Sequence, residues 1–178
     1  RSGSGKRSST PERRGSSHQR SVGMMDVPED DATDRALRAS RLSARLHDLG
    51  RHDEALAAIE EAVALYRALA DAQPEAAGPD LARSLGARGS ALRAVGLHAE
   101  AVEASGEGLK LLTPHLQRQP QTFAPLCATL LQGHLQSLLA FGGEPDEAFL
   151  SPIVEILIER GVLQLGDPDE AGPSSASP

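Results

Sequence analysis

The chain has 178 residues, which is enough for one domain with tails. Alanine and leucine dominate its middle, tryptophan is absent, and Cys127 is the single cysteine, so a disulfide within the chain is excluded. The net charge is −7, and because residues 1–25 carry +5, the remainder is strongly acidic, which argues against nucleic acid as the main ligand.

The two ends of the sequence predict disordered tails, at residues 1–30 and 166–178. Residues 1–25 are rich in Ser, Gly and Arg and have almost no apolar content, so they cannot bury enough surface to offset chain entropy. Met24-Met25 is one candidate for the native start, with the preceding stretch foreign to the protein. The other candidate lies upstream of Arg1. The helical domain is expected over residues 31–165.

The first predicted helix runs over about residues 31–49. Asp30 or Asp31 is suited to cap its N-terminus, and Gly50 is expected to end it. Its inward stripe, at a period of 3.6 residues, is expected to consist of Ala39, Leu42, Leu46 and Leu49.

The second and third helices are predicted over about residues 52–73 and 79–95. Pro74 lies beyond the end of the second helix, and Pro79 suits the first turn of the third. Gly96 is expected to end the third helix. The residues expected to face inward are Ala55, Ile59, Ala62, Val63, Tyr66 and Leu69 in the second helix and Leu81, Leu85, Leu92 and Val95 in the third.

Three further helices are predicted over about residues 98–118, 122–141 and 146–160. The first of these is weakened by two glycines, each of which costs about 1 kcal/mol relative to alanine. Pro114 predicts a kink or an early stop in the same helix. The next helix is expected to end at Gly142-Gly143.

The sequence repeats itself at a spacing of 46 residues. The stretch from Leu46 to Pro74 aligns without a gap with the stretch from Leu92 to Pro120, and a third unit continues the pattern loosely. A fixed period in this range indicates stacked helix pairs rather than one globular core. Stacked pairs usually form binding surfaces rather than reaction pockets.

These residues resemble the tetratricopeptide repeat, in its long-helix variant, over about residues 35–160. Ser43 and Gly89 match the family's small residue midway along the first helix of a pair, and Ala55 and Ala101 match its close-packed alanine early in the second. The resemblance implies an all-α fold, a right-handed α-solenoid of about three antiparallel helix pairs with disordered tails.

The resemblance also implies a non-catalytic protein-interaction module that binds a peptide or partner segment in a concave groove. The family's groove-lining positions fall here on Ser40, Ala44 and His47 in the first pair, Arg83, Gly86, Ser90 and Arg93 in the second, and Thr129, Gln132 and Gln136 in the third. Arg83 and Arg93 are suited to hold a carboxylate of the partner. The alternative, that both arginines are merely solvated, stays open.

Within the segment SPIVEILIERGVLQL, the last predicted helix is apolar on nearly all sides and therefore needs cover on nearly all sides. Either Val162–Leu165 folds back onto the stack, which we favour, or the helix meets a second copy in a homodimer. The residues concerned are Ile153, Val154, Ile156, Leu157 and Ile158.

Catalytic and cofactor motifs are not found. HExxH, CxxC and GxSxG are absent, and GSGKRSS lacks the Ser or Thr that a phosphate-binding loop needs directly after Lys6. His52 and His98 are repeat equivalents, which favours a structural role at a helix start over metal binding. We therefore expect no enzyme, no cofactor and no metal.

The surroundings of the protein are inferred from its thiol and its hydropathy. Cys127 lies in an apolar run, which favours a packed thiol in a reducing, cytoplasmic setting. No apolar run approaches the roughly 20 residues of a membrane helix, so no membrane is expected. A second interpretation of the whole chain is a fragment or sensor region of a larger regulator, behind a signalling ATPase.

Overall fold

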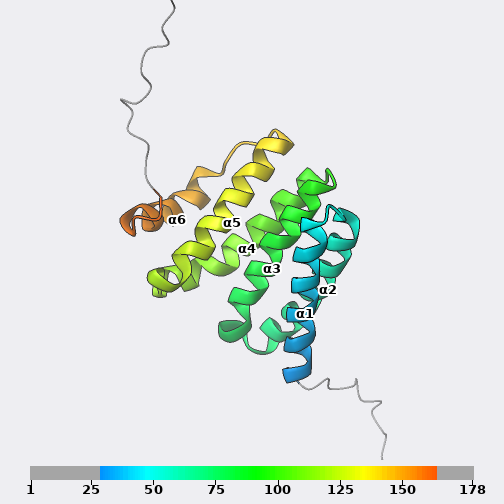
Figure 1. The fold of residues 1–178 in the computed structure, drawn as a ribbon. Coiled ribbons are helices and arrows are strands. Elements are labelled where there is room, and N and C mark those ends of the chain that lie inside the picture. Colours follow the sequence, from blue (N-terminus) through cyan, green and yellow to red (C-terminus); the bar gives the residue numbers. More distant parts are fainter. Residues whose placement is uncertain (1–28, 164–178) are drawn as a thin grey trace, which may run out of the picture.

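A computed structural model describes residues 29–163, which form helices joined by short connections (Figure 1). This confirms the all-α prediction. The predicted tails fall almost entirely outside the described residues. The six helices are α1 (Glu29–Asp48), α2 (His52–Ala72), α3 (Pro74–Ala94), α4 (His98–Arg118), α5 (Pro120–Phe141) and α6 (Glu147–Glu159).

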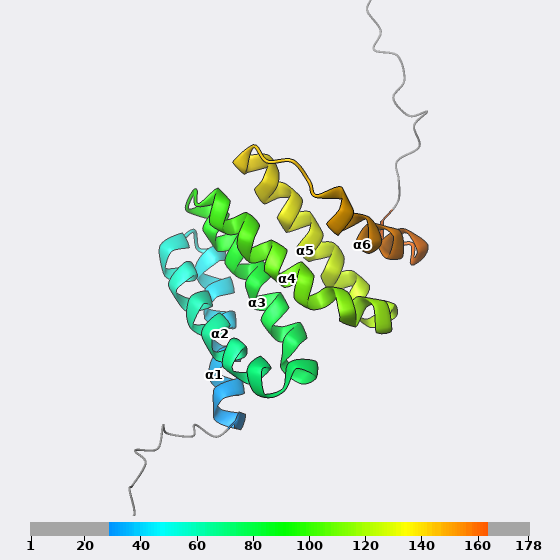
Figure 2. The same cartoon turned by 180° about the vertical axis from the view of Figure 1, so that it is seen from behind.

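From α1 to α5, each helix packs extensively against the next one in the chain. In addition, α3 contacts α5 and, over a smaller area, α1. As a result α1, α3 and α5 lie in one layer, and α2 and α4 cover that layer from the other side (Figures 1 and 2). The last helix contacts α5 and α4 over a small area only.

Within residues 29–163, three clusters of buried side chains hold these layers together, the smallest of them formed by Leu92, Ala101 and Ala104. One joins α1, α2 and α3 around Ile59, Tyr66 and Leu85. The largest one joins α4, α5 and α6, and includes Leu112 and Ile153. Each fully buried leucine or isoleucine contributes about 1.5–3 kcal/mol relative to an exposed one, so these clusters are the main source of stability.

Glycines in the left-handed conformation end the helices of the first layer. Gly50, Gly96 and Gly142 have φ values of +72°, +83° and +78°, which residues with a Cβ atom rarely adopt. The predicted helix stops at these glycines are confirmed. The turn after α1 is closed by two backbone bonds, from Gly50 N to His47 O and from Arg51 N to Leu46 O, both 2.9 Å.

Of the two proline predictions, the one at Pro79 is wrong. The third helix begins at Pro74 instead of near Pro79, because a proline at the first helical position needs no N–H partner. Pro79 therefore lies inside α3. The fourth helix ends at Arg118 as predicted, with Pro114 inside it, so of the kink and the early stop expected at Pro114 only the early stop is excluded. Burial of Leu112 and Leu116 on either side of Pro114 offsets the lost backbone bond.

The inward face of α1 also differs from the prediction. Ala39 and Leu46 are buried as expected, but Leu42 is 51% and Leu49 is 70% exposed. The buried face follows positions 36, 39, 43 and 46, which contain mostly small residues. Neither Asp30 nor Asp31 is the cap, since α1 begins at Glu29.

Small residues allow close packing within the first two helix pairs. Ser43 Oγ of α1 donates a hydrogen bond to Ala55 O of α2 at 2.8 Å. A Cβ at Gly89 of α3 would lie 3.2 Å from Ala101 O of α4. The residue 46 positions after Gly89 is Leu135, and there α5 and α6 pack far less extensively. The larger side chain of Leu135 is incompatible with the close approach seen in the first two pairs.

The segment after α6 folds back as predicted, as far as it is described. Leu163 packs against the largest cluster, and the N–H groups of Val162 and Leu163 donate to Leu157 O at 2.9 and 3.2 Å. Leu165 lies outside the described residues. Ile153 and Leu157 are buried, whereas Val154, Ile156 and Ile158 are partly buried.

Candidate partner-binding groove

Two neighbouring hollows lie on the layer formed by α1, α3 and α5. The α3–α5 hollow has a volume of about 400 Å³, and the α1–α3 hollow has a volume of about 340 Å³. Arg83 and Ala87 line both. We call the two hollows together the groove.

The α3–α5 hollow exists because glycines replace side chains along its walls. A Cβ at Gly133 would meet no atom within 4 Å, and at Gly86 it would overlap Cδ2 of Leu130. Leu130 therefore lies directly against the α3 backbone, and together with Leu126 it provides apolar lining. The groove positions implied by the resemblance did not include Leu126, Leu130 and Gly133, which line the hollow as well. The four-residue spacing of the two leucines was a usable signal, because it places them on one helix face.

Five of the seven predicted partner-binding residues line the α3–α5 hollow. They are Arg83, Ser90, Arg93, Gln132 and Gln136. Ser40 lines the α1–α3 hollow instead, where its buried Oγ has no hydrogen-bond partner. His47 lines neither hollow, and its ring centroid lies 5.1 Å from that of His52. Of the other positions carried over, Gly86 and Thr129 line the first hollow and Ala44 lines the second.

Arg93 reaches across the groove from α3 to α5. Its Nη1 donates to Ser137 Oγ at 3.2 Å and lies 3.4 Å from Gly133 O. Ser137 Oγ itself donates to Gly133 O at 2.8 Å. Among residues 29–163, Arg93 forms no ion pair with a carboxylate. The guanidinium is thus positioned by neutral groups, and its charge is uncompensated.

Arg83 is in a different state, because it pairs with Asp80 one turn earlier on α3. Both side chains are exposed, so the pair is weak, but the carboxylate offsets the charge of Arg83 locally. The two arginines are therefore neither equivalent nor merely solvated. Arg93 is the better candidate for holding an anionic group of a partner.

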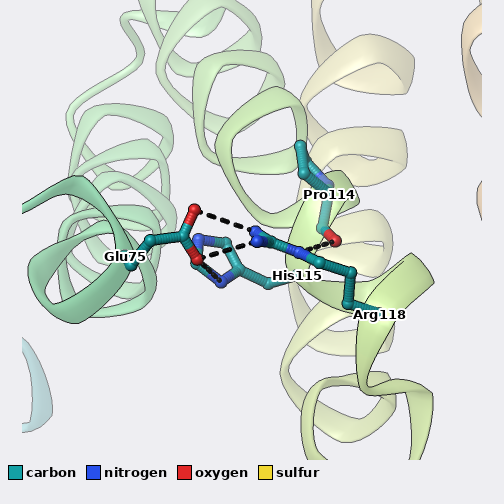
Figure 3. A network of polar contacts seen from close by, with 4 residues as sticks. All are labelled: Glu75, Pro114, His115 and Arg118. Atoms are coloured by element: carbon teal, nitrogen blue, oxygen red, sulfur yellow. Dashed lines mark hydrogen bonds and ion pairs between the residues drawn. The ribbon is translucent and has the colours of Figure 1, made fainter.

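Charges are more fully paired on the side of the molecule formed by α2, α4 and the start of α3. Arg118 Nη1 lies 2.9 Å from Glu75 Oε2, Arg118 Nη2 donates to Glu75 Oε1 at 3.2 Å, and Arg118 Nε donates to Pro114 O at 3.1 Å. Figure 3 shows this network. His115 Nδ1 lies 4.0 Å from the same carboxylate. These contacts join the start of α3 to the end of α4, and we assign them a structural role.

The remaining titratable groups of interest are buried. Cys127 is inaccessible, and burial raises the pKa of its thiol to about 11, so the thiolate is scarce at neutral pH. Among residues 29–163, no group of three or more His, Cys, Asp or Glu side chains is placed to hold a metal ion. No helix in that range has both the length and the apolar character needed to cross a membrane.

His134 is buried next to the groove wall, and its Nδ1 lies 3.0 Å from Ser105 Oγ. Burial lowers the pKa of His134, and Lys110 lowers it further, whereas a hydrogen bond with the Val102 backbone opposes the shift. The folded protein therefore favours the neutral imidazole at pH 7.

The lowered pKa of His134 predicts a pH-dependent stability. As the pH falls below about 6.5, the unfolded chain takes up a proton that the folded chain resists. The free energy of unfolding should therefore be highest above this pH and decrease below it. The His134→Gln variant lacks this contribution. Its free energy of unfolding, measured with urea, should therefore decrease less between pH 7 and pH 5.5 than that of the wild type. Equal losses in the two proteins would contradict the prediction.

Comparison with known proteins gave no match to a family model, to a curated protein or to a solved structure. The tetratricopeptide assignment therefore remains a resemblance carried by the residues. The cytoplasmic location and the interpretation as a sensor region of a larger regulator also stay predictions.

Proposed function

We propose that the helices form a tetratricopeptide-like, right-handed α-solenoid of three antiparallel pairs. The 46-residue period of the sequence recurs in the helix bounds, which supports this proposal. Both α2 and α4 have 21 residues, and they begin at His52 and His98. Both α3 and α5 begin at a proline, and each follows a glutamine with a φ of −138°. The equivalent alanines Ala55 and Ala101 are completely buried.

We further propose that the protein is a non-catalytic interaction module that binds a peptide or partner segment in the groove. The observation that carries this proposal is the α3–α5 hollow, which combines apolar lining, amide and hydroxyl groups, and the unpaired charge of Arg93. Binding sites typically have this mixture of apolar surface and a few oriented polar groups.

Each part of the hollow suits a different part of a peptide. Leu126 and Leu130 offer contact for an apolar side chain, and Arg93 offers charge-assisted hydrogen bonds to a carboxylate. The amides of Gln132 and Gln136 are both exposed, and each can donate to and accept from a peptide backbone. A segment with a bulky apolar residue close to an Asp or Glu is therefore the expected ligand.

Gly133 provides the test, because a side chain there would enter the hollow without disturbing the helix packing. Peptides selected from a random displayed library against the wild type would be measured against variants by fluorescence anisotropy. Gly133→Leu should weaken binding by about tenfold or more, because it occupies the space of the apolar anchor. Gly133→Ala is the matched control and should bind with less change.

Charge variants test the second half of the same site. Arg93→Gln should lower the affinity for acidic peptides by about tenfold. Arg83→Gln should have a smaller effect, because Asp80 already offsets the charge of Arg83. Circular dichroism would show that each variant remains folded. Selection of no peptide, or equal affinity for the wild type and folded Gly133→Leu, would reject the groove as the binding site.

A further inference from the structure

The exposed face of α5 carries no formal charge. None of its 22 residues is Asp, Glu, Lys or Arg, whereas each of the other five helices contains several charged residues. Two leucines one turn apart are exposed on this helix, Leu135 at 39% and Leu139 at 83%, and Phe141 at its end is 56% exposed. Leu135 and Leu139 share one face of the helix, and we call these two residues the α5 ridge.

Leu135 of the α5 ridge is uncovered because the last helix pair is incomplete. The 21-residue helices α2 and α4 pack extensively along α1 and α3, but α6 has only 13 residues. It contacts α5 over a small area and lies at an angle to it (Figures 1 and 2). Leu135 stands where a small residue permits close packing in the first two pairs. Neither residue of the α5 ridge lines the α3–α5 hollow.

We propose that the α5 ridge binds the same ridge of a second copy, in a dimer with two-fold symmetry. In such an interface, residues near the axis meet their own copies, so any charged side chain there would meet a like charge. A face without formal charge satisfies this condition. A different protein could instead be recognised through opposite charges, and the helix offers none.

The charge of the whole chain strengthens the choice of a second copy through this particular face. The chain carries a net charge of −7, so two copies repel each other wherever their acidic surfaces meet. Among the described helices, only α5 lacks acidic side chains. Glu144 and Asp146, which follow it, line a separate hollow with Glu103 and Lys110 of α4.

The structure thereby moves the expected self-contact from the last helix to α5. The large apolar side chains of α6, from Phe149 to Ile158, are buried or partly buried within the subunit, and none of them is exposed as Leu139 is. A leucine that is 83% exposed gains more from being covered by a second copy than a residue that is already packed.

Sedimentation equilibrium of the full chain over a wide concentration range tests the proposal. The wild type should self-associate, and Leu139→Lys should weaken the dimer by about tenfold or more, because two ammonium groups would meet at the contact. Leu49→Lys is the matched control, because Leu49 is a 70% exposed leucine on α1, and it should leave the dimer unchanged. A monomeric wild type, or equal weakening by both substitutions, would overturn the proposal.

Disulfide trapping provides a second measurement, which reports which surfaces meet without requiring the dissociation constant of the dimer to be determined. Cys127 is buried and is the single cysteine, so an added thiol at the surface is the only reactive one in the folded chain. Under mild oxidation, Leu139→Cys should give a covalent dimer on a non-reducing gel, whereas Leu49→Cys should give little. Equal cross-linking of both variants would show that collisions, and not the α5 ridge, bring the chains together.

Discussion

Replacing Gly108 by valine is expected to destabilise the protein by about 3 kcal/mol. A Cβ at this position would lie 3.0 Å from Ala82 O and 3.4 Å from Leu85 Cβ, so α4 touches α3 there with no room to spare. A carbonyl oxygen in a helix cannot move aside as a flexible side chain can, and valine adds two further carbon atoms to the contact. The pair could keep its helices only by moving apart, which would expose the leucines around the contact.

Gly133→Ala is the control for this experiment, since it is also a glycine within a helix but has open space in front of it. It should stabilise the protein by about 0.5–1 kcal/mol, because alanine favours the helix. Urea unfolding monitored by circular dichroism measures both variants. If Gly108→Val unfolded at the same urea concentration as the wild type, the close α3–α4 packing would be wrong.

Replacing Leu157 by alanine should cost about 2–5 kcal/mol and should loosen α6 more than the rest of the protein. Leu157 and Ile153 are completely inaccessible, and with Leu150 they are the buried side chains that hold this short helix. Because α6 has only small contacts with α5 and α4, few other interactions compensate for the loss.

Hydrogen exchange by mass spectrometry distinguishes local from global loosening. In Leu157→Ala, the amides of α6 should exchange much faster, while those of α2 should keep most of their protection. Leu49→Ala truncates an exposed leucine and should change stability by less than about 0.5 kcal/mol. Equal acceleration in α2 and α6 would mean that α6 is not a separate weak unit.

The helix stops at glycine could be predicted because they depend on local backbone chemistry. Gly50 and Gly96 adopt a conformation that other residues avoid, whatever packs around them. The expected helix start at Pro79 and the early stop considered at Pro114 are not seen, for the opposite reason. Pro79 and Pro114 lie within helices whose packed neighbours outweigh a local preference. On α1, the large apolar side chains predicted the wrong buried face. The true one contains small residues, which allow α2 to approach.

The groove was predictable in position but not in chemistry. The resemblance to the tetratricopeptide repeat implied which positions of α3 and α5 face the groove, and Ser90, Gln132 and Gln136 of that set line the hollow. The pairing of Arg83 with Asp80 could also have been read from their three-residue spacing. In contrast, the contact of Arg93 with Ser137 joins residues 44 positions apart, and it depends on how α3 and α5 are placed.

The succession of contacts along the chain has a consequence for how the protein folds. From α1 to α5, each helix packs chiefly on the one that follows, and α2 and α3 are separated by a single residue, as are α4 and α5. Contacts between near neighbours in sequence require little loop closure, and chains rich in such contacts fold within microseconds to milliseconds. During synthesis, α1 and α2 can pair as soon as both have left the ribosome, before α6 has been made.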